Sequence, residues 1–89
     1  MLRPSYTKQF EKDWKRQHKR GKTKEKLILV LNMLINKTPL SQKNRGHKLI
    51  GNYAGRRECH VEPDWLLIYK LTKSEIIFER TGSHSDLFQ

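Results

Sequence analysis

Apolar residues in the first third of the chain recur with the spacing of a helix. Three aromatic residues stand four positions apart and therefore share one stripe of a helix, which we expect to be buried: Tyr6, Phe10 and Trp14. Gly21 follows a basic turn and is expected to end this helix. Residues 2–4 are expected to form a short strand before it.

A second helix is predicted to follow almost at once. Thr23 is a candidate N-cap. A stripe of apolar residues would form the buried face of this helix: Leu27, Val30, Leu31 and Leu34. The segment 36–39, which includes Pro39, ends the pattern. Because the connection between the two helices is so short, we expect an antiparallel helical hairpin.

The second half of the chain has the pattern of three short strands. Residues 53–61 alternate between two faces, while residues 65–69 are apolar throughout, as in a central strand. Residues 75–80 form a third strand, and Ser83 with Asp86 resembles the start of a short terminal helix. We therefore expect one domain, residues 1–89, of the α+β class. Two N-terminal helices would pack on one face of a small antiparallel sheet.

Charge is distributed unevenly along this pattern. The formal net charge of +10 and the sequence pI of about 10.1 imply an acidic partner such as nucleic acid. Residues 1–46 hold 13 of the 19 basic and 3 of the 9 acidic side chains, and residues 47–89 hold 6 of each. We therefore expect a docking surface in the first half of the chain, separate from a chemical site in the second.

Cys59 is the only cysteine, so no disulfide can form within the chain, and its expected role is that of a small buried apolar residue. No apolar run approaches the roughly 18–20 residues that a membrane span needs. The sequence thus predicts a cytoplasmic protein without a membrane partner.

The candidate chemistry lies in histidines, one carboxylate and one arginine: His47, His60, His84, Asp64 and Arg80. Histidine takes and gives a proton near neutral pH, and arginine suits phosphate oxygens. In a three-stranded meander the end of the first strand, the start of the second and the end of the third lie at one edge. His60, Asp64, Arg80 and His84 can therefore converge. Such a set suits metal-independent cleavage of RNA by its own 2′-hydroxyl.

Simpler interpretations compete with this one. A single histidine is more often structural or solvated, Asp64 after Pro63 is also a turn former, and Arg80 could be a solvated charge. Trp65 is by default a core residue, although at the edge of a site it could stack on a base. A metal ion would also suit the histidines. The histidine spacing lacks the close pairs of metal motifs, however, and the adjacent arginine opposes a cation, so no cofactor is expected.

Long segments of the second half closely resemble one family. They are residues 46–51 (GHKLIG), 57–71 (RECHVEPDWLLIYKL), 78–84 (FERTGSH) and 87–88 (LF). With the two N-terminal helices they resemble the YafQ branch of the RelE/ParE toxin superfamily over almost the whole length. The resemblance implies a RelE-like fold and the toxin of a bacterial type II toxin–antitoxin system. Such a toxin is an endoribonuclease that cuts mRNA, usually on the ribosome, and a cognate antitoxin neutralises it.

By this resemblance, the active-site positions of the family fall on His47, His60, Asp64, Trp65, Arg80, His84 and Phe88. His84 would be the general acid and His47 or His60 the base, with Asp64 assisting. Trp65, Phe88 and Arg56 would contact the substrate. A basic segment would seat the protein on ribosomal RNA: Lys15, Arg16, Lys19, Arg20, Lys22, Lys24 and Lys26. The alternative is a non-catalytic RNA-binding or antitoxin-titrating module, whose expected sign is a broken histidine set; in this chain the set is whole.

Overall fold

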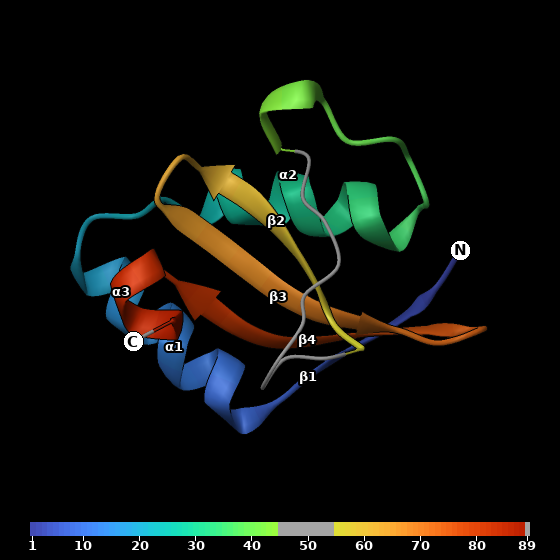
Figure 1. The fold of residues 1–89 in the computed structure, drawn as a ribbon, viewed down its shortest axis with the longest axis horizontal. Helices are drawn as coiled ribbons and strands as arrows, with labels where there is room; N and C mark the ends of the chain where they lie inside the picture. The colour runs from blue at the N-terminus through green and yellow to red at the C-terminus, as the bar shows by residue number, and fades with distance from the viewer. Residues whose placement is uncertain (45–54, 89) are drawn as a thin grey trace.

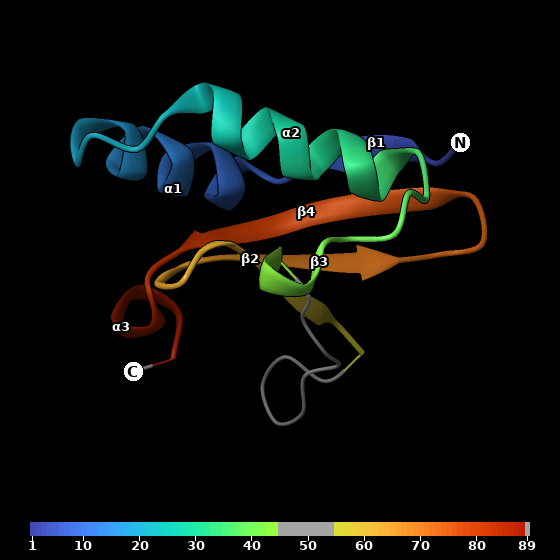
Figure 2. The ribbon, with the colours of Figure 1, turned by 90° about the horizontal axis from the view of Figure 1, so that it is seen from above.

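Two helices that run in opposite directions lie on one face of a four-stranded sheet in the computed structural model, which describes residues 1–44 and 55–88 (Figures 1 and 2). The helices are α1 (Lys8–Lys19) and α2 (Lys24–Ile35), and the strands are β1 (Arg3–Tyr6), β2 (Arg57–Glu62), β3 (Trp65–Leu71) and β4 (Glu75–Gly82). A 3₁₀ turn (Gln42–Asn44) precedes β2, and a short helix α3 (His84–Leu87) follows β4. The predicted α+β architecture and the helical hairpin are confirmed.

Local signals explain where the helices begin and end. The hydroxyl of Thr7 accepts a hydrogen bond from the backbone N–H of Phe10 at 3.0 Å, so α1 begins after Thr7. Tyr6 consequently lies in β1 with 46% of its surface exposed, and the prediction that it shares a buried helical stripe is wrong. Gly21 adopts the left-handed φ of 91° just past the end of α1, as expected of a residue that stops a helix. In α2, Ile35 is buried and Leu34 only partly so.

The sheet has the order β1-β4-β3-β2. Strands β2, β3 and β4 form the predicted antiparallel meander. The opening strand runs over Arg3–Tyr6 instead of residues 2–4, and it pairs in parallel with β4, with Tyr6 opposite Phe78. The sheet therefore has one strand more than the meander and is mixed. Parallel pairing requires a long connection, which the rest of the chain provides here.

The two faces of the sheet are covered differently. One face packs against α1 and α2, with Cys59, Leu67 and Phe78 in that core (Figure 2). On the other face Leu87 of α3 covers Leu66 and Ile68. Cys59 is fully buried, as predicted, and burial is the main reason that the pKa of its thiol rises to about 12. No helix within residues 1–44 or 55–88 is long and apolar enough to cross a membrane.

Candidate active site

His84 and Asp64 form a close pair between the start of α3 and the β2–β3 turn. Nδ1 of His84 lies 2.6 Å from Oδ1 of Asp64, and the same oxygen accepts the backbone N–H of His84 at 2.9 Å. The N–H bond, followed by the bond from the imidazole, holds the pKa of the Asp64 carboxyl below its usual range. An ionised Asp64 favours the imidazole tautomer with its proton on Nδ1. Nε2 of His84 is then the nitrogen that can exchange a proton with a substrate.

His60 stands beside this pair. It lies opposite Leu66, which in turn lies opposite Gly82, so β2, β3 and β4 bring it level with the start of α3. Its ring centroid is 6.1 Å from that of His84. Within the part of the chain that the structure describes, Nδ1 of His60 is buried and has no hydrogen-bond partner. Buried polar atoms without a partner are few in folded proteins, so this nitrogen is a notable feature of the corner.

Phe88 is the aromatic residue that follows α3. Its ring centroid lies 6.3 Å from that of His84, and 41% of its surface is exposed. An exposed aromatic ring such as this one can stack on a nucleic acid base. The structure therefore brings together four of the predicted residues, His60, Asp64, His84 and Phe88, at one corner of the sheet.

Arg80 lies near the end of β4, opposite Ile68. Its guanidinium binds the Asp13 carboxylate of α1 through Nε to Oδ2 at 2.7 Å and through Nη2 to Oδ1 at 3.3 Å. Oδ2 of Asp13 also accepts the backbone N–H of Thr81 at 3.2 Å. Arg80 is therefore a partly buried, firmly oriented cation and not the solvated charge of the simpler interpretation.

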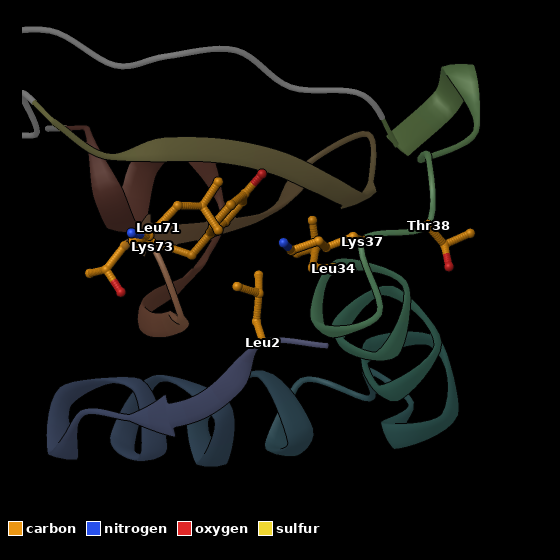
Figure 3. Close-up of a pocket in the computed structure, with 8 residues that line it drawn as sticks. Leu2, Leu34, Lys37, Thr38, Leu71 and Lys73 are labelled. Atoms are coloured by element: carbon orange, nitrogen blue, oxygen red, sulfur yellow. The ribbon is translucent and has the colours of Figure 1, made fainter.

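A pocket of about 310 Å³ lies at the other end of the sheet, where Leu2, Leu34 and Leu71 meet (Figure 3). Lys37 and Lys73 also line it. The described lining contains neither histidine nor carboxylate, so this hollow lacks the candidate acid–base groups that gather around His84.

The family model described as the bacterial toxin of a type II toxin–antitoxin system, YafQ, matches residues 2–89. The chain belongs to the YafQ toxin family. The resemblance to the YafQ branch that the sequence showed is thereby confirmed. The mRNA interferase toxin YafQ of Escherichia coli K12 is 49% identical over 84 residues, which is 93% of this chain and 91% of the relative.

Solved structures agree with this assignment over the full length. YafQ in the E. coli DinJ–YafQ toxin–antitoxin complex is 46% identical, with a TM-score of 0.90 and complete coverage of both chains. A metal-bound toxin from Helicobacter pylori is 39% identical, with a TM-score of 0.92 and coverage of 99% of this chain and all of that one.

One predicted substrate contact, Trp65, lies in the core of this YafQ-family structure. Trp65 is fully buried; its ring stacks on Trp14 and its Nε1 donates to the hydroxyl of Thr81 at 2.9 Å. Because no surface of the indole is exposed, the prediction that it stacks on a base is wrong, and Trp65 is a core residue. Nε of Arg56 lies 2.8 Å from Oε1 of Glu79, so its guanidinium is engaged by a carboxylate. His47 lies outside the described residues.

The predicted docking segment is only partly a free surface. Lys22 and Lys26 each lie 2.7 Å from an oxygen of Glu62, which is two residues before Asp64. Arg20 and, more distantly, Arg16 pair with Asp86, which is two residues after His84. The expectation that the basic segment is separate from the chemical site is therefore wrong, because four of its seven members contact acidic residues beside the site. Lys15, Lys19 and Lys24 form no ion pair within the described residues.

Sequence reasoning missed the polar stripe on α1. Asp13 and Gln17 are 5% and 2% exposed, and both face the segment that carries Arg80 and His84. Gln9 also donates to Asp13, at 3.0 Å. The available signal was polar residues at helical spacing, Gln9, Asp13, Gln17 and Arg20, on a helix whose other stripe is aromatic. That pattern is equally typical of a solvated face, so the sequence did not distinguish the two.

Proposed function

We propose that this YafQ-family toxin is an endoribonuclease that cleaves mRNA, with the His84–Asp64 pair at the centre of its acid–base chemistry. The observation that carries the proposal is the 2.6 Å contact that orients His84 beside His60 and Phe88. The name of the E. coli relative, an mRNA interferase, supports the same activity. The formal charge of +10 suits a polyanionic substrate.

The proposed reaction needs no metal. A base, His60 or His47, takes the proton of the 2′-hydroxyl, and the 2′-oxygen attacks the adjacent phosphorus. The bond from phosphorus to the 5′-oxygen breaks, and His84 in its doubly protonated, imidazolium form gives the departing oxygen the proton on Nε2, which leaves the neutral ring with its proton on Nδ1. Arg80, oriented by Asp13, stabilises the charge on the phosphorane. The products are a 2′,3′-cyclic phosphate and a 5′-hydroxyl.

The proposed partners are the ribosome and a cognate antitoxin. A basic surface would contact ribosomal RNA mainly through phosphates. An antitoxin would neutralise the toxin by covering the site or the helices, in line with the DinJ–YafQ complex of the E. coli relative. The proposed compartment is the cytoplasm, where ribosomes and mRNA meet.

The test is a translation extract programmed with a defined mRNA, with the cut ends mapped. His84→Ala should reduce cleavage by about 10²–10⁴-fold, because a positioned acid is lost. The variant should keep its fold, because His84 is exposed at the corner of the sheet. A second arm uses a short free RNA in excess EDTA, where cleavage by the parent should persist.

Two outcomes would overturn the proposal. A 5′-phosphate at the cut end would indicate attack by a water molecule instead of the 2′-hydroxyl. Translation arrest by His84→Ala equal to that of the parent would favour the non-catalytic RNA-binding module.

A further inference from the structure

Asp86 is enclosed by hydrogen-bond donors from α1 and from the start of α3. Its Oδ2 accepts the backbone N–H of Ser83 at 2.9 Å, Nε2 of Gln17 at 3.1 Å and Nη1 of Arg20 at 2.7 Å. Nη2 of Arg20 lies 3.3 Å from Oδ1. The Asp86 side chain is 13% exposed, and the bond from Arg20 is the main reason that its pKa lies far below the usual range. Asp86 is thus a fixed anion that joins α3 to α1.

The backbone beneath Asp86 is shaped to admit it. A Cβ on Gly82 would lie 2.9 Å from both Cβ and Oδ2 of Asp86, which is too close for either atom to stay in place. Asp86 therefore sits directly on the end of β4, over the one residue type that leaves room for it.

The helix that carries His84 cannot hold its own shape. Helix α3 has four residues, and a single helical turn is unstable unless other groups fix it. Besides the bond that the His84 backbone N–H donates to Asp64, three sets of contacts do so. Ser83 and Asp86 form a reciprocal capping box, Leu87 packs on the sheet, and Asp86 is bound by Gln17 and Arg20.

We propose that Gln17 and Arg20, acting through Asp86, are positioning residues for His84. They hold α3 so that the imidazole of His84 meets Asp64 and directs Nε2 toward the substrate. The inference rests on the proposed function, because only a proton-transfer role gives the orientation of His84 a consequence in rate. In this role Arg20 binds Asp86 of the same chain and is not a contact to ribosomal RNA.

Arg20 differs from other cations of α1 because it is bound to Asp86. Lys12 lies on the same helix, is exposed and forms no ion pair within the described residues. Lys12→Ala therefore removes the same charge without touching α3 and is the matched control. A general electrostatic contribution to RNA binding would make Arg20→Ala and Lys12→Ala alike.

The kinetic test compares Arg20→Ala, Arg20→Lys, Asp86→Asn and the Arg20→Ala/Asp86→Asn double variant on a short free RNA. Misplacement of a catalytic group by about 1 Å costs up to ~10²-fold in rate, so kcat should fall by that order in Arg20→Ala, with KM nearly unchanged. Arg20→Lys should recover part of the loss, because it keeps the charge without the two-pronged geometry. The double variant should be no worse than Asp86→Asn alone, because the two residues act as one unit.

A second measurement does not depend on cleavage. Imidazole ¹⁵N spectra, with the His84 signals identified by their loss in His84→Ala, report which ring nitrogen carries the proton. In the parent, the neutral ring of His84 should carry it on Nδ1, against Asp64. In Arg20→Ala that preference should weaken, while circular dichroism shows that the protein is still folded.

Each outcome has one meaning. An unchanged tautomer in Arg20→Ala overturns the positioning role, whether or not the parent cleaves RNA. A rise in KM alone, equal to that in Lys12→Ala, also overturns the positioning role. It would indicate that Arg20 belongs to the docking surface. A parent without RNase activity would refute the proposed function. The tautomer comparison would still test whether Arg20 affects the orientation of the His84 ring.

Discussion

Asp64 receives two hydrogen bonds from one residue, one from the main chain of His84 and one from its ring. Both side chains are largely exposed, at 69% and 57%. An exposed pair of this kind contributes little to the stability of a fold, because water competes for both partners. The pair instead determines orientation, because the main-chain bond fixes the Asp64 carboxylate relative to the imidazole ring of His84.

Asp64→Asn should therefore affect rate more than stability. An amide oxygen can still accept both bonds but carries no charge, so we expect kcat to fall by roughly 10–100-fold, less than the ~10²–10⁴-fold loss of a whole acid. Cleavage of a short RNA and urea unfolding would be measured together. Glu75→Gln, at the other end of β4, is the control. A shift in the unfolding midpoint without any loss of rate would contradict this assignment.

At the scale of single residues, the sequence predicted which candidate groups lie together but not the partners of Arg80 and Trp65. His60, Asp64, His84 and Phe88 do meet, because the meander fixes which strand ends share a corner. The partners of Arg80 and Trp65 come from α1 and from Thr81, and no local pattern links these residues. A side chain that reaches between elements finds its partner only through tertiary packing, which the spacing of residues does not encode.

The connection between α1 and α2 is tied to the β2–β3 turn by Glu62. The bonds from Lys22 and then Lys26 hold the pKa of Glu62 below its usual range. A carboxyl whose pKa is lower in the folded than in the unfolded chain stabilises the fold above the unfolded pKa. That stabilisation is lost as the pH falls through the folded pKa.

Glu62→Gln should accordingly lower the free energy of unfolding by up to about 1 kcal/mol at pH 7 and low salt, since these side chains are only partly buried. The difference from the parent should shrink as the pH falls through the lowered pKa of Glu62, because the protonated carboxyl is then neutral, as the glutamine is. Urea unfolding over a series of pH values from 7 downwards, repeated in 1 M salt, checks this. Equal stabilities at pH 7 and low salt would show that the two lysine contacts contribute nothing.

At the scale of elements, periodic segments were predictable, whereas for the short opening strand the presence was predicted but the bounds and the pairing were not. The helices and the meander follow from spacing, caps and turns. Strand β1 has four residues, all exposed, and it lacks the alternation that marks a strand. Its parallel pairing with β4 joins residues some seventy positions apart. The polar stripe of α1 was missed for a related reason, because burial of a polar stripe depends on what packs over it.

At the scale of the whole molecule, the excess positive charge of the first half is partly neutralised by the second. Arg16, Arg20, Lys22 and Lys26 pair with Asp86 and Glu62, so reversing their charge would disturb both sides of the site. Lys15, Lys19 and Lys24 remain as the exposed members of the docking set without an ion pair in the described structure. These three are the better test of RNA docking.

Reversal of Lys15, Lys19 and Lys24 to Glu should weaken ribosome association by orders of magnitude and reduce its salt dependence, because phosphate contacts are lost. Slow cleavage of a free RNA should suffer less. Sedimentation with ribosomes at several salt concentrations measures the first effect. Reversal of Lys8, Lys70 and Lys73 changes the net charge equally and serves as the control. If both triple variants sediment alike, charge acts generally and this surface is not a docking site.

The parallel pairing of β1 with β4 also governs when the molecule can assemble during synthesis. Thr7, just past β1, donates its backbone N–H to the carbonyl of Phe78 and its hydroxyl to that of Glu79, a separation of 72 residues in the second case (Figure 1). Contacts this distant in sequence form late, because a long loop must close first. On a growing polypeptide β1 has no partner strand, and the corner that holds His84 does not exist. The chain that is still being made on the ribosome therefore lacks this corner until β4 and α3 have emerged.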